Sequence, residues 1–332
     1  MKKTLFAALA LAFVASCSNE EVVEMAQKEA IGFDNAFINN STRSVYDPSY
    51  ASNKMFNDFK VYGFVNGNAL WDEGETVTGP TTWTYTNTQY WINGADYTFH
   101  AVAPATGWTK TAATANDGVS LNFTNDGKSD VLYSTATAQG KPNGQNSTVA
   151  LTFRHILSKV KFSFENAYNS ASSTIKVSDI HITNAHQTGS VALNGDATTW
   201  SAHAGTLNLD FGDATTDDAT TDVATAYEYG KTLESYNELL LIPGIEYTYN
   251  VTFTVHLLVS DKEIDTYSHK VDVKFTPAAG SSYDIKAIIN PKNIDPENPD
   301  GQEAIQFTVN SITGWTENNV DDILKEEETT QP

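Results

Sequence analysis

Apolar and polar residues alternate with a period of two along most of this chain. The segment 247–259, with the sequence YTYNVTFTVHLLV, is the clearest example. One face of this segment carries aromatic and branched aliphatic side chains, namely Tyr247, Tyr249, Val251, Phe253, Val255, Leu257 and Val259. The other face carries mainly threonine, asparagine and histidine. This alternation predicts a strand with one face in a core and the other in water.

The same pattern predicts many further strands, separated by turns. It recurs in the segments 58–67, 97–105, 130–138, 158–167 and 268–277. Residue pairs typical of tight turns also occur along the chain, at Asn66-Gly67, Asn93-Gly94, Asp126-Gly127, Asn194-Gly195 and Pro243-Gly244. No convincing amphipathic helix is found. These features predict an all-β protein built from antiparallel β-sandwiches rather than a parallel α/β sheet.

Two polar stretches divide the chain. The segment 137–148, TAQGKPNGQNST, is the predicted domain boundary, and the segment 290–303 is a second predicted joint, rich in proline, asparagine and acidic residues. One more strand, at 304–315, and a charged tail follow this joint. We therefore predict two β-sandwich domains and a C-terminal extension, at 44–148, 149–290 and 291–332.

The first 17 residues have the order of a secretory signal. Lys2 and Lys3 precede an apolar run at 5–14, and small residues follow before Cys17, the one cysteine of the chain. The apolar run is too short to span a bilayer as a helix. The small residues before Cys17 resemble a bacterial lipobox, in which the cysteine receives lipid and becomes the first residue. The alternative is an ordinary signal peptide that contains a cysteine.

The charge balance narrows the range of partners. The 332 residues include 41 acidic and 20 basic ones, a formal net charge of −21. A chain with this net negative charge repels nucleic acid and anionic lipid surfaces. We therefore expect neither as a partner. A single cysteine cannot form an internal disulfide, so stability must come from packed apolar surface.

The sequence lacks the familiar motifs of catalysis and metal binding. There is no Gly-x-Ser-x-Gly, no His-Glu-x-x-His and no phosphate-binding glycine loop. His181 and His186 would point to opposite faces of a strand, which is poor geometry for one ion. His155 is expected to be structural, because the sequence suggests no partner for it. We therefore predict no enzyme activity, no metal and no cofactor.

Two further groups of residues have simple structural explanations. An acidic loop lacks the glycine and the terminal glutamate of a calcium loop, so we expect it to be solvated; it contains Asp213, Asp217, Asp218 and Asp222. Four tryptophans could line a glycan platform, but in a sandwich such residues more often pack in the core or at an edge: Trp71, Trp83, Trp91 and Trp108.

A short predicted strand precedes an arginine in a polar loop. Ile31, Phe33 and Phe37 alternate with polar residues, and Arg43 and Ser44 follow. An exposed arginine in a flexible loop is a natural site for a trypsin-like protease. Cleavage between Arg43 and Ser44 would detach the strand and open a groove with unpaired backbone groups.

The last predicted strand has a similar pattern. Ile305, Phe307 and Val309 alternate with polar residues beyond the joint at 290–303. This strand could leave its own subunit and fill the groove of the next by β-strand addition, and such a head-to-tail contact propagates as a filament. The alternative keeps 304–315 folded back on its own domain, with Arg43 uncut. The pattern alone does not decide between them.

Several stretches together resemble a known family. They are the lipobox with the Arg43 loop and the segments YWINGADYTFHAVAPA (90–105), DVLYSTA (130–136), LTFRHILSKVKFSF (151–164), ELLLIPG (238–244) and ITGW (312–315). In this order they resemble the fimbrillin family of Bacteroidetes, the FimA/Mfa-like subunits of type V pili. The resemblance implies two transthyretin-like β-sandwich domains and export as a lipoprotein with lipid on Cys17. It also implies removal of 18–43 by an arginine-specific protease and polymerisation by strand exchange.

We therefore expect a non-enzymatic pilin that supports adhesion, as a stalk or general structural subunit. The expected partners are other pilus subunits, an arginine-specific protease, the lipoprotein maturation machinery and a host or bacterial surface ligand. The precursor is expected in the outer membrane and the mature protein in the cell-surface fimbrium. Replacement of Phe307 with Asp is expected to block assembly and to leave the monomer folded. The alternative function is a monomeric surface lipoprotein that binds glycan or a host protein.

Overall fold

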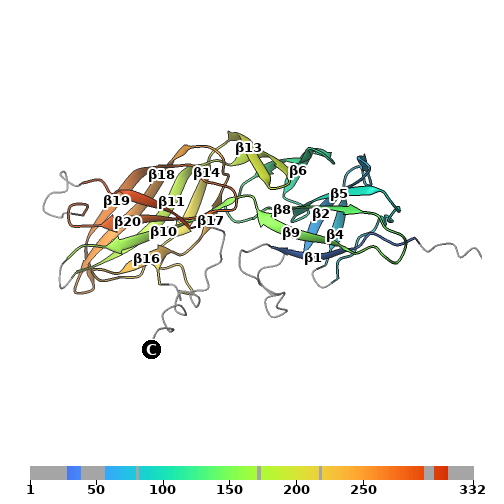
Figure 1. Ribbon diagram of the computed structural model, residues 1–332. Coiled ribbons are helices and arrows are strands. Elements are labelled where there is room, and N and C mark those ends of the chain that lie inside the picture. Colours follow the sequence, from blue (N-terminus) through green and yellow to red (C-terminus); the bar gives the residue numbers. More distant parts are fainter. Residues whose placement is uncertain are drawn as a thin grey trace, which may run out of the picture.

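The computed structural model of this chain describes residues 28–38, 57–79, 82–169, 173–216, 219–294 and 303–312. Every regular element in these ranges is a strand, and the strands form four sheets in an elongated body (Figure 1). The prediction of an all-β fold is therefore confirmed. These ranges contain no helix that is long and apolar enough to cross a membrane. Cys17, Arg43, Ser44 and the side chain of Phe37 lie outside the described residues.

The largest sheet has the N-terminal strand at its edge. Its order is β1-β9-β8-β5-β2-β3, and β4 also pairs with β2. Its strands are β1 (Phe33–Ile38), β2 (Asp58–Val65), β3 (Asn68–Ala69), β4 (Glu75–Thr78), β5 (Asp96–Ala103), β8 (Leu132–Gln139) and β9 (Val149–His155). The β2–β3 hairpin turns at Asn66 and Gly67, whose φ angles of 47° and 83° fit an Asn-Gly pair in a tight hairpin.

A four-stranded sheet packs against one face of the largest sheet. Its order is β13-β12-β7-β6. Its strands are β6 (Trp108–Thr114), β7 (Gly118–Thr124), β12 (Thr188–Asn194) and β13 (Ala197–Ala204). Side chains from both sheets share one core, which includes Tyr62, Tyr133, Leu121, Val191 and Trp200.

Two further sheets enclose the second large core, which contains Phe162, Phe164, Phe211 and Phe253. One has the order β15-β16-β10-β20-β21, with β17 also on β10, and the other has the order β14-β11-β18-β19. The strands are β10 (Ser158–Asn166), β11 (Ser173–Ala185), β14 (Leu207–Gly212), β15 (Ala214–Thr215), β16 (Thr232–Ser235), β17 (Leu239–Leu241), β18 (Tyr247–Val259), β19 (Lys262–Phe275), β20 (Ser282–Ile289) and β21 (Phe307–Ile312).

Strand pairing departs from the sequence-based picture in one respect. Most neighbours are antiparallel, as predicted, but β1 pairs with β9 and β10 pairs with β20 in parallel register. Each parallel pair joins strands that are far apart in the sequence. Turn motifs report on hairpins between consecutive strands, so they carried no signal for these two pairs.

Hydrogen-bonded strands also cross the predicted boundary after residue 148. β9 begins at Val149 and pairs with β1 and β8, and β12 pairs with β7. Segments from both sides of the boundary therefore build the same two sheets. The division into domains at 44–148 and 149–290 stays a prediction, and the pairing shows that this boundary does not separate the sheets.

Candidate functional site

The N-terminal segment lies between two other parts of the chain. Residues 85–91 line one side of segment 29–33, and residues 144–149 line the other. We term this space the N-terminal slot. The segment continues as β1, the dark blue strand beside β9 in Figure 1. Among the described strands β9 is the one neighbour of β1, so β1 lies at the edge of its sheet.

Backbone hydrogen bonds hold the segment from both sides. The Ile31 N–H donates to the Gln89 carbonyl oxygen at 2.9 Å, and the Val149 N–H donates to the Gly32 carbonyl oxygen at 2.7 Å. Buried backbone groups need such partners. Removal of the segment would therefore leave polar groups of both walls unpaired.

Two apolar side chains of the segment fill the core beneath the slot. Ile31 is 1% exposed and Phe33 is 6% exposed. The Phe33 ring makes edge-to-face contacts with Phe59, Tyr85 and Phe99, each at 5.8 Å between ring centroids. Burial of such a side chain contributes about 1.5–3 kcal/mol. These two residues are therefore the apolar anchors of the segment.

Glu29 fixes the start of the segment. Its carboxylate accepts hydrogen bonds from Asn146 Nδ2 at 2.7 Å and from the Gly144 N–H at 2.9 Å. Its carbonyl oxygen accepts a hydrogen bond from the Trp91 N–H at 2.9 Å. The hydrogen bond from the Asn146 side chain is the main reason that the pKa of Glu29 lies below its ordinary value. The sequence analysis did not single out this residue.

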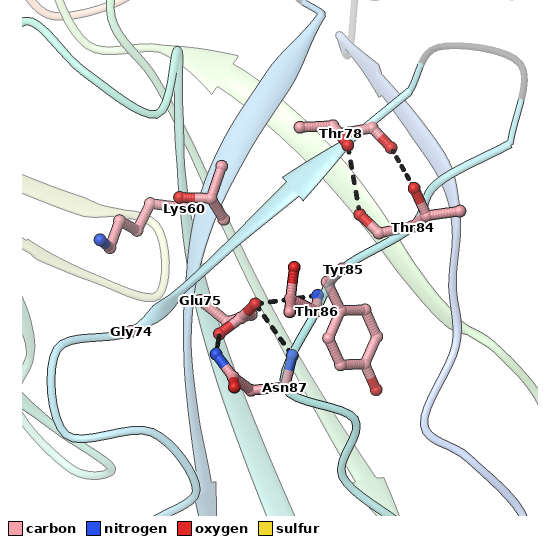
Figure 2. A pocket seen from close by; sticks show the side chains of 9 residues that line it. Lys60, Gly74, Glu75, Thr78, Thr84, Tyr85, Thr86 and Asn87 are labelled. Carbon is pink, nitrogen blue, oxygen red and sulfur yellow. Dashed lines mark hydrogen bonds between the residues drawn. The ribbon is translucent and has the colours of Figure 1, made fainter.

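Tyr85 connects the slot to a polar recess on the surface. Its hydroxyl donates to the Ile31 carbonyl oxygen at 2.6 Å. The recess has a volume of about 570 Å³ and is lined by Tyr85 together with Lys60, Gly74, Glu75, Thr76, Thr78, Thr84, Thr86 and Asn87. Figure 2 shows that the arm 84–87 runs beside β4, joined to it at Thr78 and Thr84, with Glu75 reaching across to the arm.

Glu75 holds this arm in place. It is buried, and its carboxylate accepts hydrogen bonds from the N–H groups of Thr86 (3.1 Å) and Asn87 (3.2 Å) and from Asn87 Nδ2 (2.8 Å). Burial raises the pKa of Glu75, but these hydrogen bonds outweigh burial and leave the pKa below its ordinary value. Because the carboxylate is satisfied within the protein, we interpret the recess as a support for Tyr85.

The chain has few peptide bonds that an arginine-specific protease could cleave. It contains two arginines, Arg43 and Arg154. Arg154 lies in β9, and its guanidinium donates to Thr198 Oγ1 (2.5 Å) and to the Gly195 carbonyl oxygen (3.0 Å). Because β9 is paired on both sides, its backbone is a poor protease substrate. Arg43 lies between the end of β1 and the start of β2, outside the described residues.

The C-terminal strand is folded back on its own subunit in this structure. β21 pairs with β20 in antiparallel register, and Ile305, just before it, is 2% exposed. The Phe307 ring lies 5.7 Å from Phe162, 6.0 Å from Phe164 and 5.7 Å from Phe253, as centroid distances. An aspartate at position 307 would place a charge in this core. This packing argues against the expectation that the variant leaves the monomer folded, and that expectation stays a prediction.

The three histidines considered from the sequence have separate partners in the structure. His181 donates to a backbone oxygen, whereas the His186 ring packs against Tyr247 with 4.2 Å between centroids. His155, for which the sequence suggested no partner, is hydrogen-bonded to Asp130, which corrects that expectation. In the described part of the chain, no three metal-ligating side chains come together.

The tryptophans do not form an exposed platform. Trp71 and Trp91 are buried, and Trp83 and Trp108 are half-buried. The Trp83 ring packs against Phe59 with 5.0 Å between centroids. These positions favour the packing role over the glycan platform.

The acidic loop is organised by internal hydrogen bonds. Asp222 accepts a hydrogen bond from the Asp213 N–H at 2.7 Å. Asp213 in turn accepts one from the Asp179 N–H at 3.0 Å. Asp217 and Asp218 lie outside the described residues. The described part of the loop therefore uses its carboxylates as structural acceptors.

Comparison with known families identifies the chain. A family model described as fimbrillin-like matches residues 42–315, which is most of the sequence. The chain belongs to the fimbrillin-like family. The resemblance noted from the sequence motifs is thereby confirmed, and membership points to a fimbria-related, non-enzymatic protein. No curated protein matches this fimbrillin-like chain.

Solved structures share the fold at low sequence identity. A candidate cell adhesion protein of Bacteroides ovatus has a TM-score of 0.50 and 15% identity, over 89% of this chain and 99% of that chain. One from Bacteroides uniformis has a TM-score of 0.48 and 15% identity, over 87% and 99%. The fimbrial anchor protein Mfa2 of Porphyromonas gingivalis has a TM-score of 0.37 and 13% identity, over 87% and 98%. Of these three, the first supports the fold, and none carries an argument about function.

Proposed function

We propose that this chain is a structural subunit of a cell-surface fimbrium that supports adhesion. The precursor is exported as a lipoprotein with lipid on Cys17 and resides in the outer membrane. An arginine-specific protease cleaves between Arg43 and Ser44, and segment 18–43 then leaves. The C-terminal strand of another subunit fills the vacated slot, head to tail. Membership of the fimbrillin-like family supports the fimbrial part of this proposal.

The observation that carries the proposal is the position of β1. It is an edge strand, and Ile31 and Phe33 complete a core from that edge. Loss of the strand would expose the unpaired edge of β9 and an apolar track beneath it. Such an edge is the site at which an extended segment of another chain adds to a sheet.

The strand proposed as the donor also lies at an edge. β21 has β20 as its one neighbour among the described strands, so it can separate without breaking the order of the other strands. Ile305, just before β21, and Phe307 and Val309 within it pack toward the core. These three residues are the proposed anchors in the slot of the next subunit.

The intact mass of the protein recovered from the cell surface tests this function. A chain that begins at Ser44 without lipid is the expected result for an assembled subunit. A chain that still begins at lipidated Cys17 would overturn the proposed activation and favour a monomeric surface lipoprotein or an anchor subunit. An Arg43→Ala precursor is the matched control, because it should keep its N-terminal segment in the same cells.

The state of assembly is tested separately on a mildly denaturing gel. Subunits joined by strand exchange should run as a ladder that collapses to one band after heating, because only noncovalent bonds join them. A single band before heating, from protein that begins at Ser44, would contradict polymerisation. The Arg43→Ala protein should show one band under both conditions.

A further inference from the structure

The two exchangeable segments share a short sequence pattern. Residues 29–33 read Glu-Ala-Ile-Gly-Phe, and residues 303–307 read Glu-Ala-Ile-Gln-Phe, so four of five positions are identical. In each case the phenylalanine begins a six-residue strand, β1 or β21, that ends with isoleucine. The isoleucines within the patterns, Ile31 and Ile305, are both buried. The same side chains therefore anchor both strands.

We propose that this shared pattern sets the register of strand exchange. Residues 303–307 of one copy take the places of residues 29–33 in the N-terminal slot of the next copy. The donor strand then runs parallel to β9, as β1 does. This inference rests on the proposed function, which states that β21 enters the slot, and adds which donor residue lies at which position.

The backbone of the slot does not set a register by itself. The hydrogen bonds at Gln89 and Val149 go to main-chain groups, which any extended segment can offer. A shift of two residues keeps the same side chains facing the core, because side chains alternate along a strand. The register must therefore be fixed by side chains that differ between positions.

The glutamate of the pattern distinguishes the registers. In the slot, the Glu29 carboxylate faces Asn146 and the Gly144 N–H. In its own subunit, the Glu303 carboxylate contacts Lys292 Nζ at 3.0 Å, and its side chain is 59% exposed. The Lys292 contact is a single ion pair whose two side chains are exposed, and such a pair contributes little, whereas the slot offers the carboxylate hydrogen bonds from both Gly144 and Asn146. Entry into the slot therefore improves the surroundings of Glu303.

Shifted registers lose this contact. A donor displaced by two residues in either direction would present Ile305 or Gly301 where Glu29 had been. Neither residue has a side chain that accepts a hydrogen bond. The Gly144 N–H would then lose its carboxylate acceptor, and Asn146 Nδ2 would keep the Lys141 carbonyl oxygen at 3.0 Å but lose the carboxylate, so both shifts are disfavoured.

One position in the pattern differs, and its fit is tight. A Cβ atom added to Gly32 would lie 3.0 Å from Thr148 Cγ2. The proposed register places Gln306 at this position. Thr148 is exposed, so its methyl group has room to move away. Thr148 therefore lies beside the donor and is a suitable site for a probe.

Disulfide trapping measures the register directly. A Cβ atom added to Gly32 would lie 3.9 Å from Thr148 Cβ, which is within the range of a disulfide, and the proposed register places Gln306 at this position. Three full-length variants combine Thr148→Cys with Gln306→Cys, or with Ala304→Cys or Thr308→Cys, which the two shifted registers would place there. All three donor positions are exposed in the folded subunit, so the variants are matched. Cleavage after Arg43 removes Cys17, so no other thiol remains.

The pattern of cross-links decides between the registers. After cleavage, assembly and mild oxidation, the Gln306→Cys variant should give a covalent ladder that survives heating, at least five-fold stronger than either other variant. A stronger ladder from Ala304→Cys or Thr308→Cys would overturn the register. A heat-labile ladder without any cross-link would also overturn it. If the protein without added cysteines forms no ladder after cleavage, the proposed function itself fails.

Discussion

Truncation of Phe33 tests how strongly the N-terminal strand stabilises the precursor. Phe33 is 6% exposed, and its ring contacts Phe59, Tyr85 and Phe99. Phenylalanine-to-alanine changes in cores lower the free energy of unfolding by about 3–5 kcal/mol. The strand lies at a sheet edge, where neighbouring side chains can close part of the cavity. We therefore expect Phe33→Ala to lower the free energy of unfolding by about 3 kcal/mol, near the lower end of that range.

Urea denaturation of the uncleaved precursor measures this change. Tryptophan fluorescence is a suitable signal, because Trp71 and Trp91 belong to the same core as Phe33. Ala30→Ser is the matched control, since Ala30 lies in the same segment and its side chain is exposed. Exposed substitutions of this kind change the free energy of unfolding by about 0.5 kcal/mol or less.

The comparison between the two variants gives a clear refutation. If Phe33→Ala and Ala30→Ser unfold at the same urea concentration with the same slope, Phe33 does not anchor the strand. The groove proposed to open on cleavage would then lack its main apolar site. A second measurement, the rate at which the cleaved segment dissociates, should rise for Phe33→Ala and stay unchanged for Ala30→Ser.

Four further predictions follow from the slot and the C-terminal strand. The pKa values of Glu29 and Glu75 are lowered in the folded protein, so both carboxylates stabilise the fold above the ordinary pKa of 4.5, and this stabilisation is lost as the pH falls below that value. In a plot of the free energy of unfolding against pH, Glu29→Gln should therefore show a smaller decrease than the unchanged protein over roughly pH 5 to 3. Glu75→Gln should lower the free energy of unfolding by about 1–3 kcal/mol and speed hydrogen exchange in 84–89, and equal exchange there would contradict the role of the arm. Phe307→Ala should lower the unfolding free energy of the unassembled subunit by about 3 kcal/mol, and an unchanged thermal midpoint would argue against its packed position. Arg43→Ala subunits keep their N-terminal segment, so their slots stay filled and cannot accept a donor strand. Mixed at about one in ten with cleavable subunits, they should end growing polymers and shorten the ladder, and an unchanged ladder length would refute strand exchange at the slot.

The sequence was sufficient where structure depends on neighbouring residues. The segment 247–259 alternates so regularly that the predicted strand and β18 have the same bounds. Its inward residues, such as Val251 and Phe253, are buried. The Asn66-Gly67 turn was also evident, because positive φ angles favour this pair. In these cases a few adjacent residues determine the local geometry.

The sequence was insufficient where structure depends on distant residues. The parallel pairing of β1 with β9 and the crossing of strands past residue 148 depend on contacts between remote segments. Glu29 and Glu75 act through loops that come close only in the folded chain. One signal was available for Glu29, namely its match with Glu303 in the repeated pattern. Nothing comparable marked Glu75, which lies in an unremarkable polar stretch.

The repeated pattern also bears on why cleavage is needed for the proposed exchange. Isoleucine and phenylalanine leave one core and enter another, so their apolar contributions nearly cancel when β21 moves. In the precursor, β1 is tethered beside the slot at an effective concentration of about millimolar or more, so a strand from another subunit competes poorly. Cleavage removes this tether, and the detached segment is diluted once it dissociates. The direction of exchange then follows from loss of the tether, with the hydrogen bonds of Glu303 favouring one register.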